Sequence, residues 1–154
     1  METTQLGRTG VTVSRLGFGG APAGLTNYLN PYSPSDQQQR EAVIAALHKA
    51  VELGITYFDT APGYGAGSGE AIYGEALAGV TTPIFLATKI NHSEPNVRAA
   101  IEASLTRLRR DCLDLVQIHG SSYSPALASS ILGEGGLLAQ LETLRDEGVI
   151  RFLG

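Results

Sequence analysis

The hydrophobic positions of this chain change their spacing from one segment to the next. In residues 33–54 the apolar side chains recur every three or four positions, as on one face of a helix: Val43, Ile44, Leu47 and Val51. Ser33 can cap this helix, Pro34 suits its first turn, and Gly54 can end it in the left-handed conformation. The segment ITYFD that follows is mostly β-branched or aromatic, and it predicts a short buried strand.

The alternation of helix and strand patterns continues along the chain. Further helices are predicted over residues 68–79, 96–110 and 137–148. Further strands are predicted at IFLAT, LDLVQI and IRFLG, and an earlier one at VSRLGFGG. The segment TTQLGRTGVTVS before that first strand is predicted to form a hairpin across one end of the sheet.

Near-continuous apolar strands separated by amphipathic helices predict an α/β fold with a covered parallel sheet and right-handed crossovers. The pattern holds four complete strands and the start of a fifth. No linker or change of composition divides the chain, so residues 1–154 are predicted to form one domain. A closed (β/α)₈ barrel typically needs about 250 residues, which is well above this length.

Composition narrows the class of protein. Hydrophobic residues make up 43% of the chain, which is enough for a core, and no apolar run is long enough to cross a bilayer. The net charge of −4 provides no basic face for nucleic acid. The first residues lack the pattern of a secretory signal, and the single cysteine, Cys112, cannot form an internal disulfide, so we expect a cytoplasmic protein.

Two other groups of residues are given no binding role. His92 and Cys112 lie far from any other metal-ligand pattern, so no metal site is predicted. The cluster Arg107, Arg109 and Arg110 closes a predicted helix, where positive charge favours the helix dipole, and we interpret it as structural.

Polar side chains follow three successive predicted strands. Asp59 follows ITYF, Lys89 follows IFLAT, and His119 follows LDLVQI. The two intervals between them are equal, and each is about one βα repeat of roughly 30 residues, so the three should lie side by side at one rim of the sheet. In barrel enzymes polar side chains at this rim are usually catalytic.

Tyr64 lies in the loop after Asp59, where glycines allow tight turns and leave space beside the phenol: Gly63, Gly65, Gly67 and Gly69. A phenol is a poor acid at neutral pH, but a neighbouring ammonium stabilises its phenolate form. A carboxylate paired with the same ammonium would hold it in place. Asp59, Lys89 and Tyr64 are therefore predicted to form a proton-transfer unit, with His119 free to donate a hydrogen bond to a substrate oxygen.

Each of these residues also has a structural interpretation. Asp59 could cap the turn, and Lys89 could be a solubilising charge at a strand end. His119 could be a buried, hydrogen-bonded histidine, and Tyr64 an ordinary loop aromatic. We favour the site because all four coincide at matched strand ends. The glycine loop GYGAGSG contains no literal G-x-G-x-x-G, which leaves a Rossmann domain only as a distant alternative.

Several ordered segments of the chain resemble the aldo-keto reductase family. They are LGRTGVTVSRLGFGG, YFDTAPGYGAGSGEAIYGEAL, LATK, ASLTRLRRDCLDLVQIHG and LRDEGVIRFLG. The resemblance implies the N-terminal portion of a TIM (β/α)₈ barrel, with strands 1 to 4, the start of strand 5 and an N-terminal hairpin.

The resemblance also implies an activity, namely hydride transfer between a nicotinamide and an aldehyde or ketone. The usual cofactor of the family is NADPH, with NADH as the alternative. Tyr64 matches the family's proton donor, Lys89 the residue that activates it, Asp59 the residue that orients Lys89, and His119 the residue that positions the carbonyl. Gly19, Gly20 and Asp59 match positions that approach the nicotinamide.

Members of the family continue through strands five to eight, whose loops supply most of the grip on the cofactor. Half a barrel leaves two unpaired strand edges and an uncovered apolar interior. We therefore expect the chain to be a piece of a longer enzyme. The alternatives are self-association through the exposed strand edges, and a truncated, non-catalytic half-barrel that acts as an assembly or binding module. The carbonyl substrate and the direction of the reaction are not fixed by the sequence.

Overall fold

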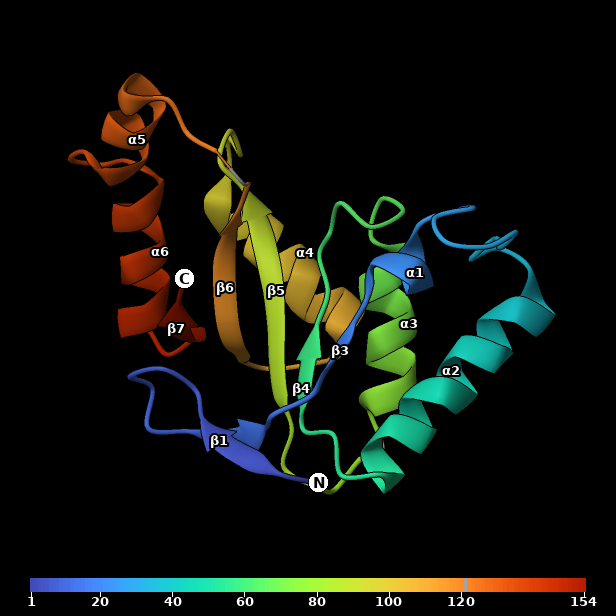
Figure 1. Cartoon of the computed structure of the whole chain (residues 1–154). Helices are drawn as coiled ribbons and strands as arrows, with labels where there is room; N and C mark the ends of the chain where they lie inside the picture. The colour runs from blue at the N-terminus through green and yellow to red at the C-terminus, as the bar shows by residue number, and fades with distance from the viewer. Residues whose placement is uncertain (121) are drawn as a thin grey trace.

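The computed structural model describes residues 1–120 and 122–154, and five of its strands form one parallel sheet (Figure 1). In their order across the sheet, these strands are β3 (Gly17–Gly19), β4 (Tyr57–Asp59), β5 (Phe85–Asn91), β6 (Leu113–His119) and β7 (Ile150–Leu153). Each strand pairs with the next strand of the sequence, which is the order found in the wall of a (β/α)₈ barrel. The predicted α/β fold with a parallel sheet is confirmed.

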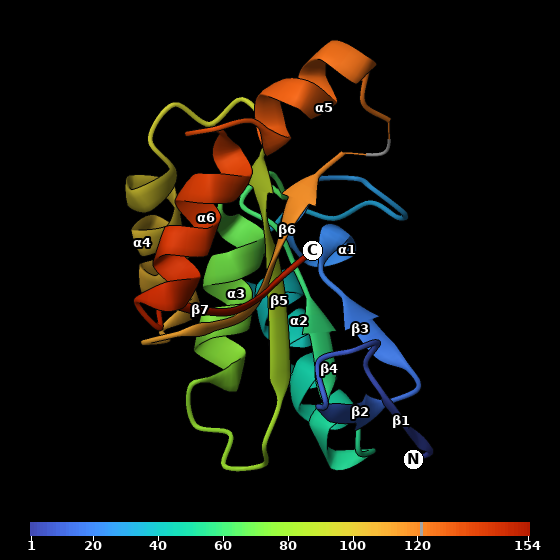
Figure 2. The same cartoon turned by 90° about the vertical axis from the view of Figure 1, so that its left-hand side faces the viewer.

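Six helices accompany the sheet in the described residues. They are α1 (Ala21–Gly24), α2 (Gln37–Glu52), α3 (Ser68–Leu77), α4 (Val97–Leu108), α5 (Pro125–Leu132) and α6 (Leu137–Asp146). Figure 2 shows α3, α4 and α6 on one side of the sheet, with the N-terminal hairpin on the other side. The sheet therefore has a helix-covered face and a second face that is partly closed by the hairpin.

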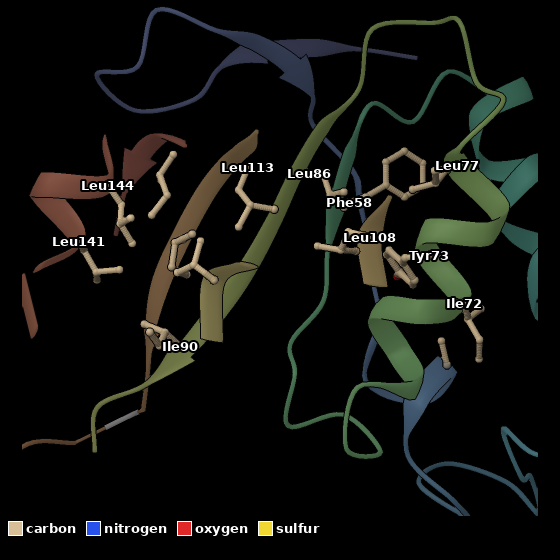
Figure 3. Close-up of a cluster of buried hydrophobic side chains, with 14 of the residues drawn as sticks. Phe58, Ile72, Tyr73, Leu77, Leu86, Ile90, Leu108, Leu113, Leu141 and Leu144 are labelled. Carbon is tan, nitrogen blue, oxygen red and sulfur yellow. The ribbon is translucent and has the colours of Figure 1, made fainter. Parts of the chain in front are cut away.

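The main core lies between the sheet and the helices. Phe58, Leu86 and Val116 point from the strands into this layer. The helices contribute buried side chains to the same cluster, several of which are drawn in Figure 3: Ile72, Tyr73, Leu77, Leu108, Leu141 and Leu144. Because side chains alternate along a strand, residues next to these apolar ones face the opposite side of the sheet.

The hairpin consists of β1 (Thr3–Gln5) and β2 (Thr12–Ser14), which pair antiparallel as predicted. Val13 of β2 packs with Phe85, Ala87 and Leu115 in a second buried cluster. The hairpin lies near the amino ends of β4 and β5 (Figure 1). It covers the end of the sheet opposite to the predicted rim.

Some boundaries differ from the sequence prediction. The N-cap of α2 is Asp36 and not Ser33, because the Asp36 carboxylate accepts a hydrogen bond of 2.9 Å from the Gln39 N–H. Ser33 lies in the turn before the helix, where its carbonyl accepts from the Asp36 N–H. Gly54 adopts a φ of +85° after the helix, as expected.

The strand that contains Lys89 is longer than predicted. β5 continues past IFLAT to Asn91 because its backbone keeps pairing with β6, with Asn91 opposite His119. Two short helices were not predicted at all, α1 and α5. None of the helices in the described parts of the chain has both the length and the apolar character needed to span a membrane.

Phe58 offers a direct test of the core, since its side chain is 0% exposed beneath the helices. We expect Phe58→Ala to lower the free energy of unfolding by about 3–5 kcal/mol, because it removes buried apolar contacts and leaves a cavity. Urea denaturation followed by circular dichroism measures the change. Leu132→Ala is the control, since Leu132 is 65% exposed, and it should change the value by no more than about 0.5 kcal/mol. Equal losses would contradict this account of the core.

Candidate active site

Asp59 and Lys89 form an ion pair at the carboxyl end of the sheet. The Lys89 Nζ donates to Asp59 Oδ1 at 2.5 Å and to the Thr60 carbonyl at 2.9 Å. The pairing of β4 with β5 places Asp59 opposite Ala87, two positions from Lys89 and on the same face. The side chains of Lys89 and Asp59 are 14% and 26% exposed, so the pair is shielded from water but reachable from the rim.

Tyr64 and His119 complete the group. The Lys89 Nζ lies 5.1 Å from the centroid of the Tyr64 ring. The ring of His119, at the exposed end of β6, meets the Tyr64 ring edge-on, with centroids 5.9 Å apart and an interplanar angle of 87°. The structure thus brings together all four side chains that the sequence singled out, from two strand ends, a strand interior and one loop.

A cavity of about 490 Å³ opens beside these residues. Lys89, His119 and Gly63 line one side of it, and most of the remaining lining comes from α4 and the segment before it, including Ala99 and Arg107. Asp59 and Tyr64 are not part of this lining. Its volume is within the range of ordinary small-molecule sites, and the cavity adjoins two of the four polar residues, Lys89 and His119.

The loop that carries Tyr64 is held by its own backbone. The Tyr64 N–H donates to the Ala61 carbonyl at 3.1 Å, and the Tyr64 carbonyl accepts from the Gly69 N–H at 3.0 Å. Gly65 and Gly67 have φ values of +68° and +93°, which side chains rarely tolerate. The glycines therefore permit the tight turn that leads from the end of β4 into α3.

A buried charge network supports the site from the helix side. The carboxylate of Glu70, in the first turn of α3, is 0% exposed. It accepts a hydrogen bond of 2.6 Å from the Thr88 hydroxyl and one of 2.7 Å from the Arg107 Nε. Thr88 precedes Lys89 in β5, so one carboxylate connects α3, α4 and the strand of the lysine.

The sequence interpretation singled out only one member of this network, Arg107. Arg107 was predicted to favour the dipole at a helix end, whereas in the structure it pairs with a buried carboxylate, and the sequence interpretation did not identify Glu70. The available signal was an acidic residue inside the largely apolar helix segment SGEAIYGEAL, since a buried charge needs a partner.

Another tyrosine lies close in sequence but in a different environment. Tyr73 of α3 is 0% exposed, and its hydroxyl donates to the Phe18 carbonyl at 3.2 Å. Burial raises the pKa of the Tyr73 phenol above its usual value. Tyr73 is therefore part of the core, whereas Tyr64 faces Lys89 and His119.

The two glycines predicted to lie near a cofactor differ in their surroundings. Gly19 ends β3 opposite Asp59, and a Cβ placed on it would meet no atom within 4 Å. Gly20 is buried, and a Cβ there would lie 2.8 Å from Thr60 Oγ1. Close packing alone thus accounts for Gly20, while Gly19 borders open space at the rim.

Metal-type ligands do not gather in the described residues. Within 1–120 and 122–154, no three His, Cys, Asp or Glu side chains come close enough to hold one ion together.

Thr88→Val tests the support beneath Lys89. Valine keeps the shape of threonine but removes the hydroxyl that donates to the fully buried Glu70 carboxylate. We expect the free energy of unfolding to fall by about 1–3 kcal/mol, because a buried charge loses a partner. The control is Thr143→Val at an exposed position of α6, which should cost no more than about 0.5 kcal/mol in the same urea denaturation experiment. A Thr88→Val loss as small as that of the control would contradict the network.

The sequence of the chain is similar to known proteins along its length. The model of the aldo/keto reductase family matches residues 15–154. L-galactose dehydrogenase of Arabidopsis thaliana is 32% identical over 164 residues, which cover 100% of this chain and 48% of that protein. Methylglyoxal reductase of Escherichia coli is 39% identical over 112 residues, which cover 71% of this chain and 39% of that protein.

Solved structures resemble the fold as well. The holo form of an aldo-keto reductase from Bacillus halodurans superposes with a TM-score of 0.76 at 31% identity, covering 100% of this chain and 49% of that one. An aldo-keto reductase from Klebsiella pneumoniae in complex with NADPH gives 0.73 at 28% identity, covering 94% and 46%. The chain spans about half the length of the relatives it matches, which are TIM barrels, so the predicted partial barrel is confirmed.

Proposed function

Because this chain belongs to the aldo/keto reductase family, we propose that it carries the proton-transfer residues of an NADPH-dependent oxidoreductase acting on an aldehyde or ketone. The observation that carries the proposal is the position of the Lys89 ammonium, 2.5 Å from Asp59 Oδ1 and 5.1 Å from the Tyr64 ring centroid. The names of relatives, a dehydrogenase and a reductase, support the class of reaction. The NADPH complex of one relative supports NADPH over NADH.

The nicotinamide, when bound, supplies the hydride chemistry. In the direction of reduction, Tyr64 donates its phenolic proton to the carbonyl oxygen as that oxygen gains negative charge. The Lys89 ammonium, 5.1 Å from the centroid of the ring, supplies a positive charge near the negative charge that Tyr64 then carries. In the direction of oxidation the same phenolate accepts the proton of the alcohol.

Asp59 has a positioning role in this proposal. Its carboxylate and the Thr60 carbonyl both accept hydrogen bonds from the Lys89 Nζ, which fixes the ammonium beside the phenol. A free lysine side chain would sample many rotamers and lose this geometry. Asp59 therefore acts through Lys89.

His119 lies on the open side of the site. Its ring is exposed and stands edge-on to Tyr64, so an imidazole N–H can donate to the same carbonyl oxygen that receives the phenolic proton. Two donors converging on one oxygen would fix the carbonyl in the orientation needed for transfer. The adjoining cavity of about 490 Å³ is the proposed place for the rest of a small substrate.

The residues present fit the nicotinamide end of the cofactor. Gly19 has no side chain, and the space that a Cβ would enter is open within 4 Å. A flat ring can therefore approach the carboxyl end of β3 next to Asp59. In this proposal the nicotinamide lies against Gly19 and against the backbone of Gly20.

Tyr64→Phe tests the proton donor. Reduction of a simple aromatic aldehyde with NADPH should fall by about 10²–10⁴-fold, because the positioned acid is lost. The dissociation constant for NADPH, followed by cofactor fluorescence, should stay the same. The matched control is Tyr73→Phe, which removes only the hydroxyl of a fully buried ring and should leave turnover intact. Retained turnover in Tyr64→Phe would exclude the proposed role.

A second candidate function is assembly, and the sheet edges are the observation that favours it. β3 and β7 each pair on one side only among the described strands, and unpaired edges favour association. Beside β3, an apolar hollow of about 300 Å³ is lined by Phe18, Pro22 and Val43. In this proposal two half-barrels associate, or the non-catalytic half-barrel binds a partner through an edge.

Self-association predicts a mass that depends on concentration. We expect sedimentation velocity to show an increasing average mass as the chain is concentrated, because edge pairing buries apolar surface and satisfies backbone groups. A stable monomer over the whole range would count against self-association. Turnover of the monomer would favour the enzyme over the assembly module.

A further inference from the structure

The backbone of the Tyr64 loop lies in direct contact with α1. A Cβ placed on Gly24, the last residue of α1, would lie 2.3 Å from the Tyr64 carbonyl oxygen and 2.8 Å from the Tyr64 Cβ. Gly24 is helical and has no positive φ, so any residue could adopt its conformation. Glycine is required at this position for space alone.

The contact is reciprocal. A Cβ on Gly65, the residue after Tyr64, would lie 2.0 Å from the Gly24 carbonyl oxygen. On the other side of Tyr64, the Gly69 N–H donates to the Tyr64 carbonyl at 3.0 Å. The Tyr64 peptide is therefore held between the end of α1 and the first turn of α3.

α1 is itself fixed in place. The N–H groups of Ala23 and Gly24 donate to the Gly20 carbonyl at 3.0 and 3.2 Å, so the short helix is tied to the end of β3. The Tyr32 hydroxyl donates to the Ala23 carbonyl at 2.8 Å from the other side. Ala23 is only 3% exposed. A side chain added at Gly24 must therefore displace the Tyr64 loop or this anchored helix.

We propose that Gly24 is a positioning residue that sets where the Tyr64 phenol lies relative to Lys89 and His119. This inference rests on the proposed function, in which Tyr64 is the proton donor. A Cβ contact of 2.3 Å must open to more than 3.0 Å, so alanine at position 24 shifts the Tyr64 backbone by roughly 1 Å. A misplacement of about 1 Å is enough to cost roughly 10²-fold in rate.

The first experiment reads the position of Tyr64 without any turnover. Nuclear Overhauser contacts between the Tyr64 and His119 rings are measured in the unmodified chain, where the ring centroids are 5.9 Å apart, and assigned with Tyr64→Phe. In Gly24→Ala we expect these contacts to weaken severalfold and the Tyr64 ring resonances to shift. The Tyr57 ring, stacked on Phe85 at the other end of the sheet, should not change.

Gly79→Ala is the matched control, because a Cβ at Gly79 would meet nothing within 4 Å and its φ is not positive. It should leave the Tyr64–His119 contacts as they are. Unchanged contacts in Gly24→Ala would overturn the inference. If Gly24→Ala does not fold, Gly69→Ala replaces it, since alanine is the better helix former and its Cβ would lie 3.2 Å from the Tyr64 Cβ. A Tyr64 spectrum unaffected by Gly69→Ala would then overturn the inference.

A kinetic measurement separates the inference from the proposed function. With NADPH and the aromatic aldehyde, Gly24→Ala should lower kcat by about 10²-fold while leaving the NADPH dissociation constant unchanged. A variant that only lost stability would have fewer folded molecules, but the Tyr64–His119 ring contacts in those molecules would be as strong as in the unmodified chain. Absence of turnover in the unmodified chain counts against the proposed function, whereas the ring contacts still decide the role of Gly24. Full kcat in Gly24→Ala would contradict the inference.

Discussion

Parallel pairing in register is the constraint on which the candidate site depends. It places Asp59 opposite Ala87, Lys89 opposite Gln117, and Asn91 opposite His119, so the polar groups of three strands share one face and one end. A slip of one residue in β5 would turn Lys89 towards the helices and bring Thr88 to the rim. Side chains alternate between the two faces of a strand, so the apolar residues of β5 that pack under α3 and α4 determine which face Lys89 points to.

Two sets of contacts hold the candidate site in place, one acting on the strand of Lys89 and the other on the loop of Tyr64. The buried Glu70 carboxylate connects the first turn of α3 to Thr88, which fixes the strand of Lys89 against the helix that follows Tyr64. The glycine contact between Gly24 and the Tyr64 carbonyl fixes the loop from the opposite side. Charge and hydrogen bonding thus set the position of Lys89. The position of Tyr64 depends on close backbone contact with α1, which only glycine at position 24 permits.

Sequence alone predicted the strands, the long helices and the four rim residues, because period and spacing are local properties of the chain. It did not predict α1, which has four residues and cannot show a helical period, or α5, whose eight residues give a helical period only one repeat, from Leu127 to Ile131. Glu70 and Gly24 were missed for another reason. Their partners, Arg107 and Tyr64, are distant in sequence. The acidic residue in an apolar helix segment was a signal that Glu70 needs a partner, but it did not identify that partner, and Gly24 shows no unusual backbone conformation.

The N-terminal hairpin has a consequence for how such a chain tolerates change. It packs through Val13 onto Phe85 and Leu115, at the end of the sheet opposite to Tyr64 and His119 (Figure 1). The same strands therefore present a closed, apolar end and an open, polar end, separated by the length of β5 and β6. Substitutions at the closed end change mainly the stability of the fold, and substitutions in the loops at the open end change mainly which ligands bind. Each kind has little effect on the other property.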